Sequence, residues 1–402
     1  MAYEINEAKA LVVEAGKKLV ESGLIARTWG NVSARISDTQ FVITPSGRAY
    51  ETLTPDEIVV VNIDDCEYEG DIKPSSEKGI HADAYRLRDD VNFVIHTHQV
   101  NASVISCVTY GINNVSKKEA EIIGPVVPSA AYGMPSTGKL RDGVASAVAC
   151  YPEAKSFVMQ HHGALCLGAD FDEAFLVAET LESVCGKEIA RVASRVSGKK
   201  LNSTMLANAF ACKYPGHFTK VDLGSSERIS DSTFELVMED GKKYICNIES
   251  GVAYKGIAPR VSLIHANIYK NSDAKFVAPL VSKDVAALSY AVSKLAPYLD
   301  DFDQIAGYGV KVCNWAPTSY RTDAIAIGKA SKGQNAVVVR GIGALCTANS
   351  RYDLEAVKLV LEKECKTQMY SKLVVTGEPL AMLDNILMRT IYLLKYSKQA
   401  NK

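Results

Sequence analysis

The sequence predicts an α/β (α+β) protein made of two similar lobes in tandem. Its 402 residues are enough for two domains, and its 47% hydrophobic and 23% charged residues are ordinary for a globular protein. Helical and strand-like segments alternate along the first half, and residues 220–402 repeat this pattern in weakened form. We therefore expect a first domain over residues 1–205 and a second over residues 206–402.

Charge, hydropathy and cysteine usage exclude several classes of protein. The net charge is −1 and the pI is about 6.7, so no basic excess indicates a nucleic-acid or anionic-membrane partner. The polar N-terminus is not typical of a signal peptide, and no apolar run reaches the roughly 18 residues of a membrane span. The ten cysteines are scattered without a C-x-x-C pair, which is typical of reduced thiols in a cytoplasmic protein.

The elements of the first half follow from periodicity and turn signals. Apolar residues recur at helical spacing in several segments, and short β-branched runs lie between them. The expected helices are residues 4–22, a segment opening at Ser75-Ser76-Glu77, 101–107, 139–150 and 172–192. The expected strands include residues 41–43, 58–63, 93–98 and 155–167. The polar, broken segment 193–216 is predicted to be the linker between the lobes.

One strand is predicted to carry a metal half-site. His96 and His98 end the apolar run that begins at Phe93, and alternate residues of a strand point to the same face. Two imidazoles on one face suit zinc, copper, iron or nickel, and a catalytic zinc commonly takes a third protein ligand. Both His161 and His162, which end another apolar run, are candidates for that ligand. Glu77 is a candidate acid.

Two turns rich in glycine and hydroxyl groups are candidate anion sites. Thr44-Pro45-Ser46-Gly47 ends a strand, and Ser75-Ser76 precedes a helix whose free N–H groups suit a phosphate. Gly30-Asn31 forms a third turn whose backbone can approach an anion. The alternatives are a helix cap at Ser75 and an ordinary turn at Gly30.

The second half keeps the pattern and loses the candidate ligands. Residues 264–269 echo residues 80–85, residues 276–281 echo 93–98, and residues 341–346 echo 161–166. In this copy Pro279, Val281 and Ile342 occupy the three histidine places, and Pro259-Arg260-Val261 replaces Ser75-Ser76-Glu77. The contrast between the halves favours a functional role for the candidate ligands of the first half. The alternative is that these residues lie at a dispensable site and were lost from the second half by drift.

These motifs, in this order, resemble the class II aldolase/adducin family, close in pattern to its L-fuculose-1-phosphate aldolase and L-ribulose-5-phosphate 4-epimerase branches. The shared residues are Gly30-Asn31-Val32-Ser33, Thr44-Pro45-Ser46-Gly47, Ser75-Ser76-Glu77, His96-x-His98 and His162-Gly163. The resemblance implies a mainly antiparallel sheet flanked by helices, with residues 206–402 a degenerate second copy. It implies Zn²⁺, or another divalent ion such as Mn²⁺ or Co²⁺, on His96, His98 and His162, and Glu77 as acid/base. It implies a phosphate site of Gly30, Asn31, Ser46, Gly47, Ser75 and Ser76.

The function implied is a metal-dependent aldolase that cleaves or forms a C–C bond in a phosphorylated ketose through a metal-stabilised enolate. A divalent ion can stabilise that charge, and a carboxylate can move the proton. The alternatives are a sugar-phosphate 4-epimerase using the same retro-aldol step and a non-catalytic, adducin-like binding protein. In one departure from the family, Lys117 stands where these aldolases place a tyrosine. Single-copy relatives form rings of four, so we expect a homodimer of tandem chains or a homotetramer.

Overall fold

The computed structural model describes residues 2–25, 29–108 and 110–396 and shows two compact units. The first unit comprises residues 1–192 with 375–378 and 390–402, and the second comprises residues 193–374 with 379–389. Among the described residues, no helix has the length and apolarity needed to cross a membrane. All ten cysteines are free thiols.

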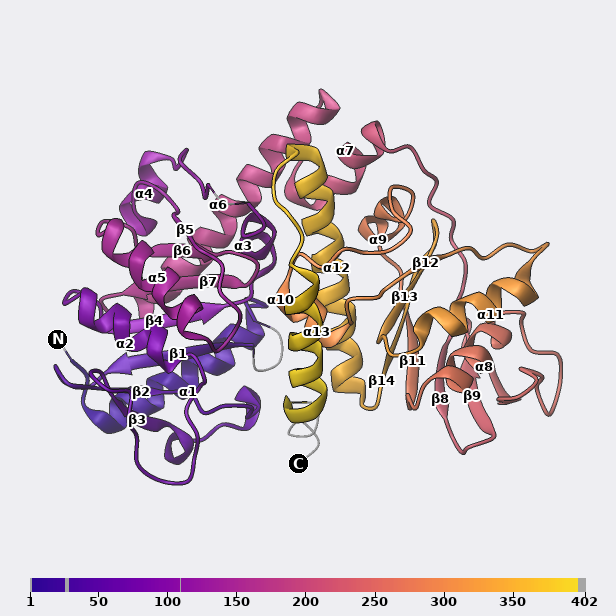
Figure 1. Cartoon of the computed structure of the whole chain (residues 1–402), viewed down its shortest axis with the longest axis horizontal. Coiled ribbons are helices and arrows are strands. Elements are labelled where there is room, and N and C mark those ends of the chain that lie inside the picture. The colour runs from indigo at the N-terminus through magenta and orange to yellow at the C-terminus, as the bar shows by residue number, and fades with distance from the viewer. Residues whose placement is uncertain (1, 26–28, 109, 397–402) are drawn as a thin grey trace. The chain divides into compact units, whose positions relative to one another are not determined.

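The first unit contains one seven-stranded sheet with helices on both faces (Figure 1). Its strands are β1 (Gly30–Arg35), β2 (Gln40–Ile43), β3 (Val59–Asn62), β4 (Phe93–Thr97), β5 (Ser129–Ala130), β6 (Ser156–Met159) and β7 (Gly163–Gly168). Its helices are α1 (Ile5–Glu21), η1 (Tyr50–Thr52), η2 (Pro55–Glu57), α2 (Lys78–Leu87), α3 (Val100–Ile105), α4 (Lys117–Ile123), α5 (Gly138–Cys150) and α6 (Phe171–Ser197).

The strand order of the first sheet is β3-β2-β1-β4-β7-β6-β5. Every neighbouring pair is antiparallel except β5 with β6. The mainly antiparallel sheet that the sequence analysis expected is therefore confirmed. Strands β1 and β4 lie in the middle of the sheet. Residues at the ends of these two strands therefore lie midway along the border that the strand ends form, and helices α2 and α5 approach them from one face.

Helices α2 and α5 pack together over one face of the first sheet and bury a continuous apolar core. Val94 of β4 belongs to that core with Ile80 of α2 and Leu140 of α5. His96 lies two residues beyond Val94 on the same strand, so it points to the face that α2 covers. Alternation along β4 thus directs this histidine toward the beginning of α2.

The second unit contains a sheet with the same arrangement, in the order β10-β9-β8-β11-β14-β13-β12. Its strands are β8 (Ser225–Arg228), β9 (Thr233–Val237), β10 (Lys243–Asn247), β11 (Phe276–Leu280), β12 (Val312–Cys313), β13 (Ala336–Val339) and β14 (Gly343–Ala348). The helices that follow the end of α6 are η3 (Ser203–Met205), α7 (Leu206–Lys213), α8 (Ser262–Asn271), α9 (Lys283–Leu288), α10 (Asp300–Ile305), α11 (Tyr320–Ser331), α12 (Arg351–Val374), α13 (Met382–Ile391) and η4 (Tyr392–Tyr396).

Strand register confirms which residues stand in the histidine places of the second sheet. His96 of β4 faces Leu165 of β7, and Pro279 of β11 faces Leu345 of β14. Val281 then follows β11 as His98 follows β4, and Ile342 directly precedes β14 as His162 precedes β7. The second unit retains the sheet and has apolar side chains at these three positions.

The expectation of a broken linker over residues 193–216 was wrong in part. Helix α6 continues to Ser197, and α7 follows from Leu206 to Lys213. Helix α7 buries Leu206 and Phe210 as it packs against α9 and α12. The polar residues 198–205 suggested a long loop, but an apolar face after them is enough to form a docked helix.

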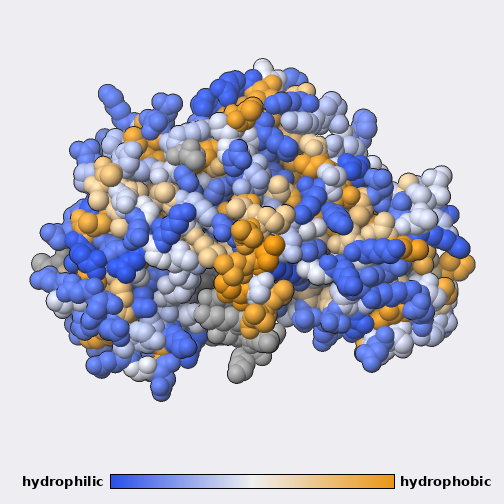
Figure 2. All heavy atoms as spheres, in the orientation of Figure 1, coloured by the Kyte–Doolittle hydropathy of each residue, from blue (hydrophilic) through white to orange (hydrophobic). Residues whose placement is uncertain are grey.

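Helix α13 is amphipathic and joins the second unit through its polar side. Arg389 donates to the carbonyl oxygens of Gln304 (2.6 Å) and Ile305 (2.9 Å). On the other side Leu383 and Leu387 are 80% and 45% exposed. Figure 2 shows hydrophobic side chains gathered over this helix.

Candidate active site

Three histidines converge at the end of strand β4. His96 lies on β4, His98 follows it, and His162 lies in the turn between β6 and β7. One ligand atom from each lies within 4.8 Å of the others, and the ring centroids are 4.6–4.9 Å apart. Antiparallel pairing of β4 with β7 brings the two segments together, although 64 or more residues separate them in sequence.

The turn before β7 separates His162 from His161. His161 adopts the left-handed backbone conformation, with φ at +61°, and its ring packs edge-on against Tyr132 at 5.4 Å. His162 instead stacks on His96, with an angle of 5° between the ring planes. Of the two candidates that the sequence left open, His162 is therefore the one that joins the histidine cluster.

Glu77 faces this cluster from the N-cap of helix α2. Its Oε1 lies 3.0 Å from His162 Nε2, and its Oε2 lies 3.3 Å from His96 Nε2. Burial alone would raise the pKa of Glu77, but His162 and His96 hold that pKa well below its usual range. A deprotonated carboxylate in contact with imidazole nitrogens can serve as a base or as a further ligand.

The histidine cluster offers three imidazole nitrogens to a divalent metal ion, and His96 with His98 fits such an ion in spacing. His96 Nδ1 lies 2.9 Å from the carbonyl oxygen of Ala164, which only accepts, so Nδ1 carries a proton and Nε2 is the nitrogen that faces the other histidines and Glu77. Burial lowers the pKa of His96 well below its usual range. His96 Nε2 lies 3.1 Å from His98 Nε2, near the roughly 3.3 Å expected between nitrogens of a tetrahedral zinc site.

Asn31 also lies in this site, opposite His96 on the neighbouring strand β1. Its Nδ2 donates to Glu77 Oε2 at 3.0 Å, and its Oδ1 accepts from His81 Nε2 of helix α2. Gly30, one residue earlier, has φ at +126°, and a Cβ there would lie 2.5 Å from the carbonyl oxygen of His96. The absence of a side chain at Gly30 therefore allows β1 to lie against β4 beside the site.

The two hydroxyl-bearing turns are joined directly. The backbone N–H of Ser75 donates to the carbonyl oxygen of Thr44 (3.0 Å), and that of Ser46 donates to the carbonyl oxygen of Lys73 (2.9 Å). Ser76 accepts a hydrogen bond from Ser136 Oγ at 2.9 Å. Segments 29 residues apart in sequence thus form one hydroxyl-rich edge that continues into Glu77.

One feature of the site was not predicted from the sequence, and one residue departs from the family pattern. The bridge from Glu77 through Asn31 to His81 was missed, because it joins a helix to a strand 46 or more residues away in the sequence. Lys117, in the place of the family tyrosine, is exposed at the first turn of α4.

Comparison with known proteins assigns the family. Residues 10–189 match the Class II Aldolase and Adducin N-terminal domain. A 5-deoxy-D-ribulose 1-phosphate aldolase of Bacillus thuringiensis is 34% identical over 179 residues, which span 44% of this chain and 82% of that protein. The chain belongs to the class II aldolase/adducin family.

Other relatives match a similar share of this family member. A 5-methylthioribulose-1-phosphate/5-deoxyribulose-1-phosphate aldolase of Escherichia coli is 36% identical over 177 residues, 43% of this chain and 79% of that protein. A solved L-fuculose 1-phosphate aldolase is 28% identical, with a TM-score of 0.43, and covers 49% of this chain and 90% of that one. The two curated aldolases are thus matched over about four-fifths of their own length.

Proposed function

We propose that this protein is a metal-dependent aldehyde-lyase that cleaves or forms a C–C bond in a phosphorylated ketose. The observation that carries the proposal is the convergence of three imidazoles and an ionised carboxylate beside one hydroxyl-rich edge, in a chain of the class II aldolase/adducin family. We assign the reaction to residues 1–205 and regard residues 206–402 as a lobe without metal ligands.

His96, His98 and His162 would hold the divalent ion, Zn²⁺ or a similar metal. When bound there, the ion supplies Lewis-acid polarisation of the ketone, which makes the adjacent C–C bond easier to break. In the cleavage direction the Glu77 carboxylate accepts the proton of the hydroxyl group, whose carbon becomes the aldehyde. The electron pair of the broken bond passes to the ketone fragment, and Glu77 returns the proton to the carbon that lost its neighbour.

The phosphate is assigned to the hydroxyl-rich edge formed by Ser46, Gly47, Ser75 and Ser76, with Gly30 and Asn31 at its inner end. Hydroxyl groups and backbone N–H groups at the beginning of α2 offer donors to an anion, and the helix dipole has its positive end there. This edge leads directly to Glu77, so a phosphate at one end of a short ketose leaves its carbonyl near the histidine cluster.

Ser75→Ala tests the phosphate assignment. We expect KM for the phosphorylated ketose to rise about tenfold, because one hydrogen bond to a charged group contributes about 1.5 kcal/mol. The same variant should leave KM for the unphosphorylated ketose nearly unchanged, which makes that ketose the internal control. An equal loss with both substrates would mean that Ser75 supports the fold and not the phosphate.

We further propose that the protein acts in the cytoplasm and assembles as a homodimer of tandem chains, with a four-chain ring as the alternative. The second unit keeps the strand order of the first and lacks the histidines, so it can occupy a place in an assembly without adding a metal site. Mass measurement in solution distinguishes dimer from tetramer, and a fully active monomer of the full chain would exclude both.

Product analysis tests the proposed activity. The metal-loaded protein should convert 5-deoxyribulose 1-phosphate or L-fuculose 1-phosphate into an aldehyde and a phosphorylated three-carbon ketone. These two ketoses are chosen because relatives of this chain bear their names. An isomer of unchanged mass would instead indicate epimerisation. The absence of any conversion by metal-loaded protein, across a panel of ketose phosphates, would favour a binding protein.

A further inference from the structure

A buried hydrogen-bond chain leads from the core of the first unit to the carboxylate of Glu77. Tyr85 OH lies 2.7 Å from Ser33 Oγ, and Ser33 Oγ lies 2.6 Å from His81 Nδ1. His81 Nε2 contacts Asn31 Oδ1, and Asn31 Nδ2 lies 3.0 Å from Glu77 Oε2. Ser33, His81, Asn31 and Tyr85 are all buried. We call these four residues the positioning chain.

The direction of every bond in this chain follows from its two ends. Asn31 has its Nδ2 toward Glu77 and its Oδ1 toward His81, so the amide donates to the carboxylate and accepts from the imidazole. His81 then carries its proton on Nε2 and accepts at Nδ1 from the Ser33 hydroxyl. Ser33 in turn accepts from Tyr85. Burial lowers the pKa of His81 to about 3, which keeps the ring neutral and the direction fixed.

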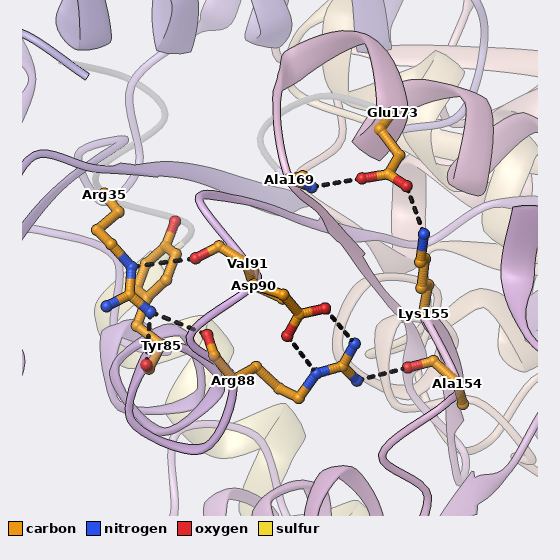
Figure 3. Close-up of polar contacts among 9 residues, drawn as sticks. All are labelled: Arg35, Tyr85, Arg88, Asp90, Val91, Ala154, Lys155, Ala169 and Glu173. Carbon is orange, nitrogen blue, oxygen red and sulfur yellow. Dashed lines mark hydrogen bonds and ion pairs between the residues drawn. The ribbon is translucent and has the colours of Figure 1, made fainter. Parts of the chain in front are cut away.

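The far end of the positioning chain is held rigidly by Arg35. Its Nε donates to the carbonyl oxygen of Val91 at 3.0 Å, and its Nη2 donates to those of Tyr85 (2.5 Å) and Arg88 (3.0 Å) (Figure 3). The guanidinium carbon also lies 4.9 Å from the centre of the Tyr85 ring, which it covers. Helix α2 is thereby tied at its C-terminal end to strand β1.

The second unit contains the same network of serine, histidine, tyrosine and arginine, but its histidine bonds a backbone carbonyl group in place of an amide and a carboxylate. Ser226 Oγ lies 2.7 Å from His265 Nδ1 and 2.8 Å from Tyr269 OH. Arg228 donates to the carbonyl oxygen of Tyr269 at 2.8 Å and covers its ring at 4.7 Å. The shared part of the network therefore stabilises the packing of helix on strand, and it does not by itself require a catalytic site.

The two units differ where the network meets the site. Strand register places Gly224 at the position of Asn31, since Ser226 faces Val277 as Ser33 faces Val94. His265 Nε2 instead donates to the carbonyl oxygen of Leu223 at 2.8 Å. That carbonyl fixes the same Nε2–H tautomer by an independent route. The second unit, which has no counterpart of Glu77, also has no counterpart of the Asn31 amide, and its hydrogen-bond network ends at a backbone carbonyl group.

We infer that Asn31 and His81 are positioning residues that orient the Glu77 carboxylate toward His96 and His162. This role rests on the proposed function only for the reaction that the oriented Glu77 carboxylate then carries out. It goes beyond the phosphate contact proposed for Asn31, because the two ends of this amide meet Glu77 and His81. A carboxylate held by a fixed donor retains one orientation for its proton transfers and for its contact with the metal ligands.

The matched pair His81→Leu and His265→Leu tests the inference in the full chain. Both remove a buried imidazole from the same Ser–His–Tyr network, so both should reduce the free energy of unfolding. Only His81→Leu should lower kcat, by about 10- to 100-fold with KM little changed, and weaken the affinity for Zn²⁺ alone by a similar factor. Equal effects of the two variants on Zn²⁺ affinity and kcat would overturn the inference.

Two further measurements keep the test decisive if a histidine variant fails to fold. Asn31→Ala keeps the His81 ring, removes the amide that joins it to Glu77, and should reproduce the loss of kcat and of Zn²⁺ affinity. Nitrogen-15 spectra of the metal-free chain should show His81 and His265 as Nε2–H tautomers, with Asn31→Ala changing the His81 signals alone. An Nδ1–H tautomer at His81 would contradict the hydrogen-bond directions of the positioning chain. Zn²⁺ affinity and tautomer are read without turnover, so failure of the proposed aldolase activity remains separate.

Discussion

Replacing His96 or His162 with alanine is expected to remove both the bound metal and the turnover. His96 comes from strand β4 and His162 from the turn before β7, and their rings stack against each other, so loss of either leaves two imidazoles where three converge. Lewis-acid stabilisation contributes several kcal/mol to such a reaction, which corresponds to a fall of roughly 10³-fold or more in kcat. Metal content after dialysis and single-turnover assays measure the two losses separately.

His161→Asn is the control for these variants. Asparagine tolerates the left-handed backbone conformation that His161 adopts, and the ring of His161 packs against Tyr132 outside the histidine cluster. This variant should keep one equivalent of metal and near-normal activity. A His162→Ala protein that retains metal and turnover while His161→Asn loses them would reverse the assignment of the third ligand.

Glu77→Gln is expected to slow turnover by roughly 10²–10⁴-fold, because glutamine keeps the size of the side chain and cannot carry the proton. Asn31 can still contact the new amide oxygen, so the local fold should survive. Metal content at saturating Zn²⁺ should fall little, since the three histidines remain, although the Zn²⁺ affinity should weaken as it does in His81→Leu. The comparison of kcat and bound metal in one preparation is the measurement, and near-normal kcat at full metal content would exclude Glu77 as the acid/base.

The sheet and the histidine cluster were accessible from sequence because they follow from short-range rules. Alternation on a strand places His96 and His98 together, and the apolar run ending at His162 marks a neighbouring strand end. Comparison with the second copy, which has Pro279 and Ile342 in the ligand places, distinguished the candidate metal ligands from residues that the fold alone requires. Helix α7 was missed because eight residues with one apolar face are a weak signal without the surface on which they dock.

The contacts around Glu77 needed the tertiary structure. Asn31 was recognised as part of a turn, yet its pairing opposite His96 depends on the register of β1 with β4. The family resemblance selected His162 over His161, and the structure adds a positive φ at His161, which no residue type in that turn signals. Strand register and local backbone conformation, more than residue type, decide which polar groups meet.

Titration of a divalent metal into the metal-free chain, with C–C cleavage followed at each addition, tests the central claim most directly. Only one unit carries three converging histidines among the described residues, so cleavage should rise linearly with added metal and level off at one ion per chain. Full cleavage activity before any metal is added, or a break at two ions per chain, would contradict the account.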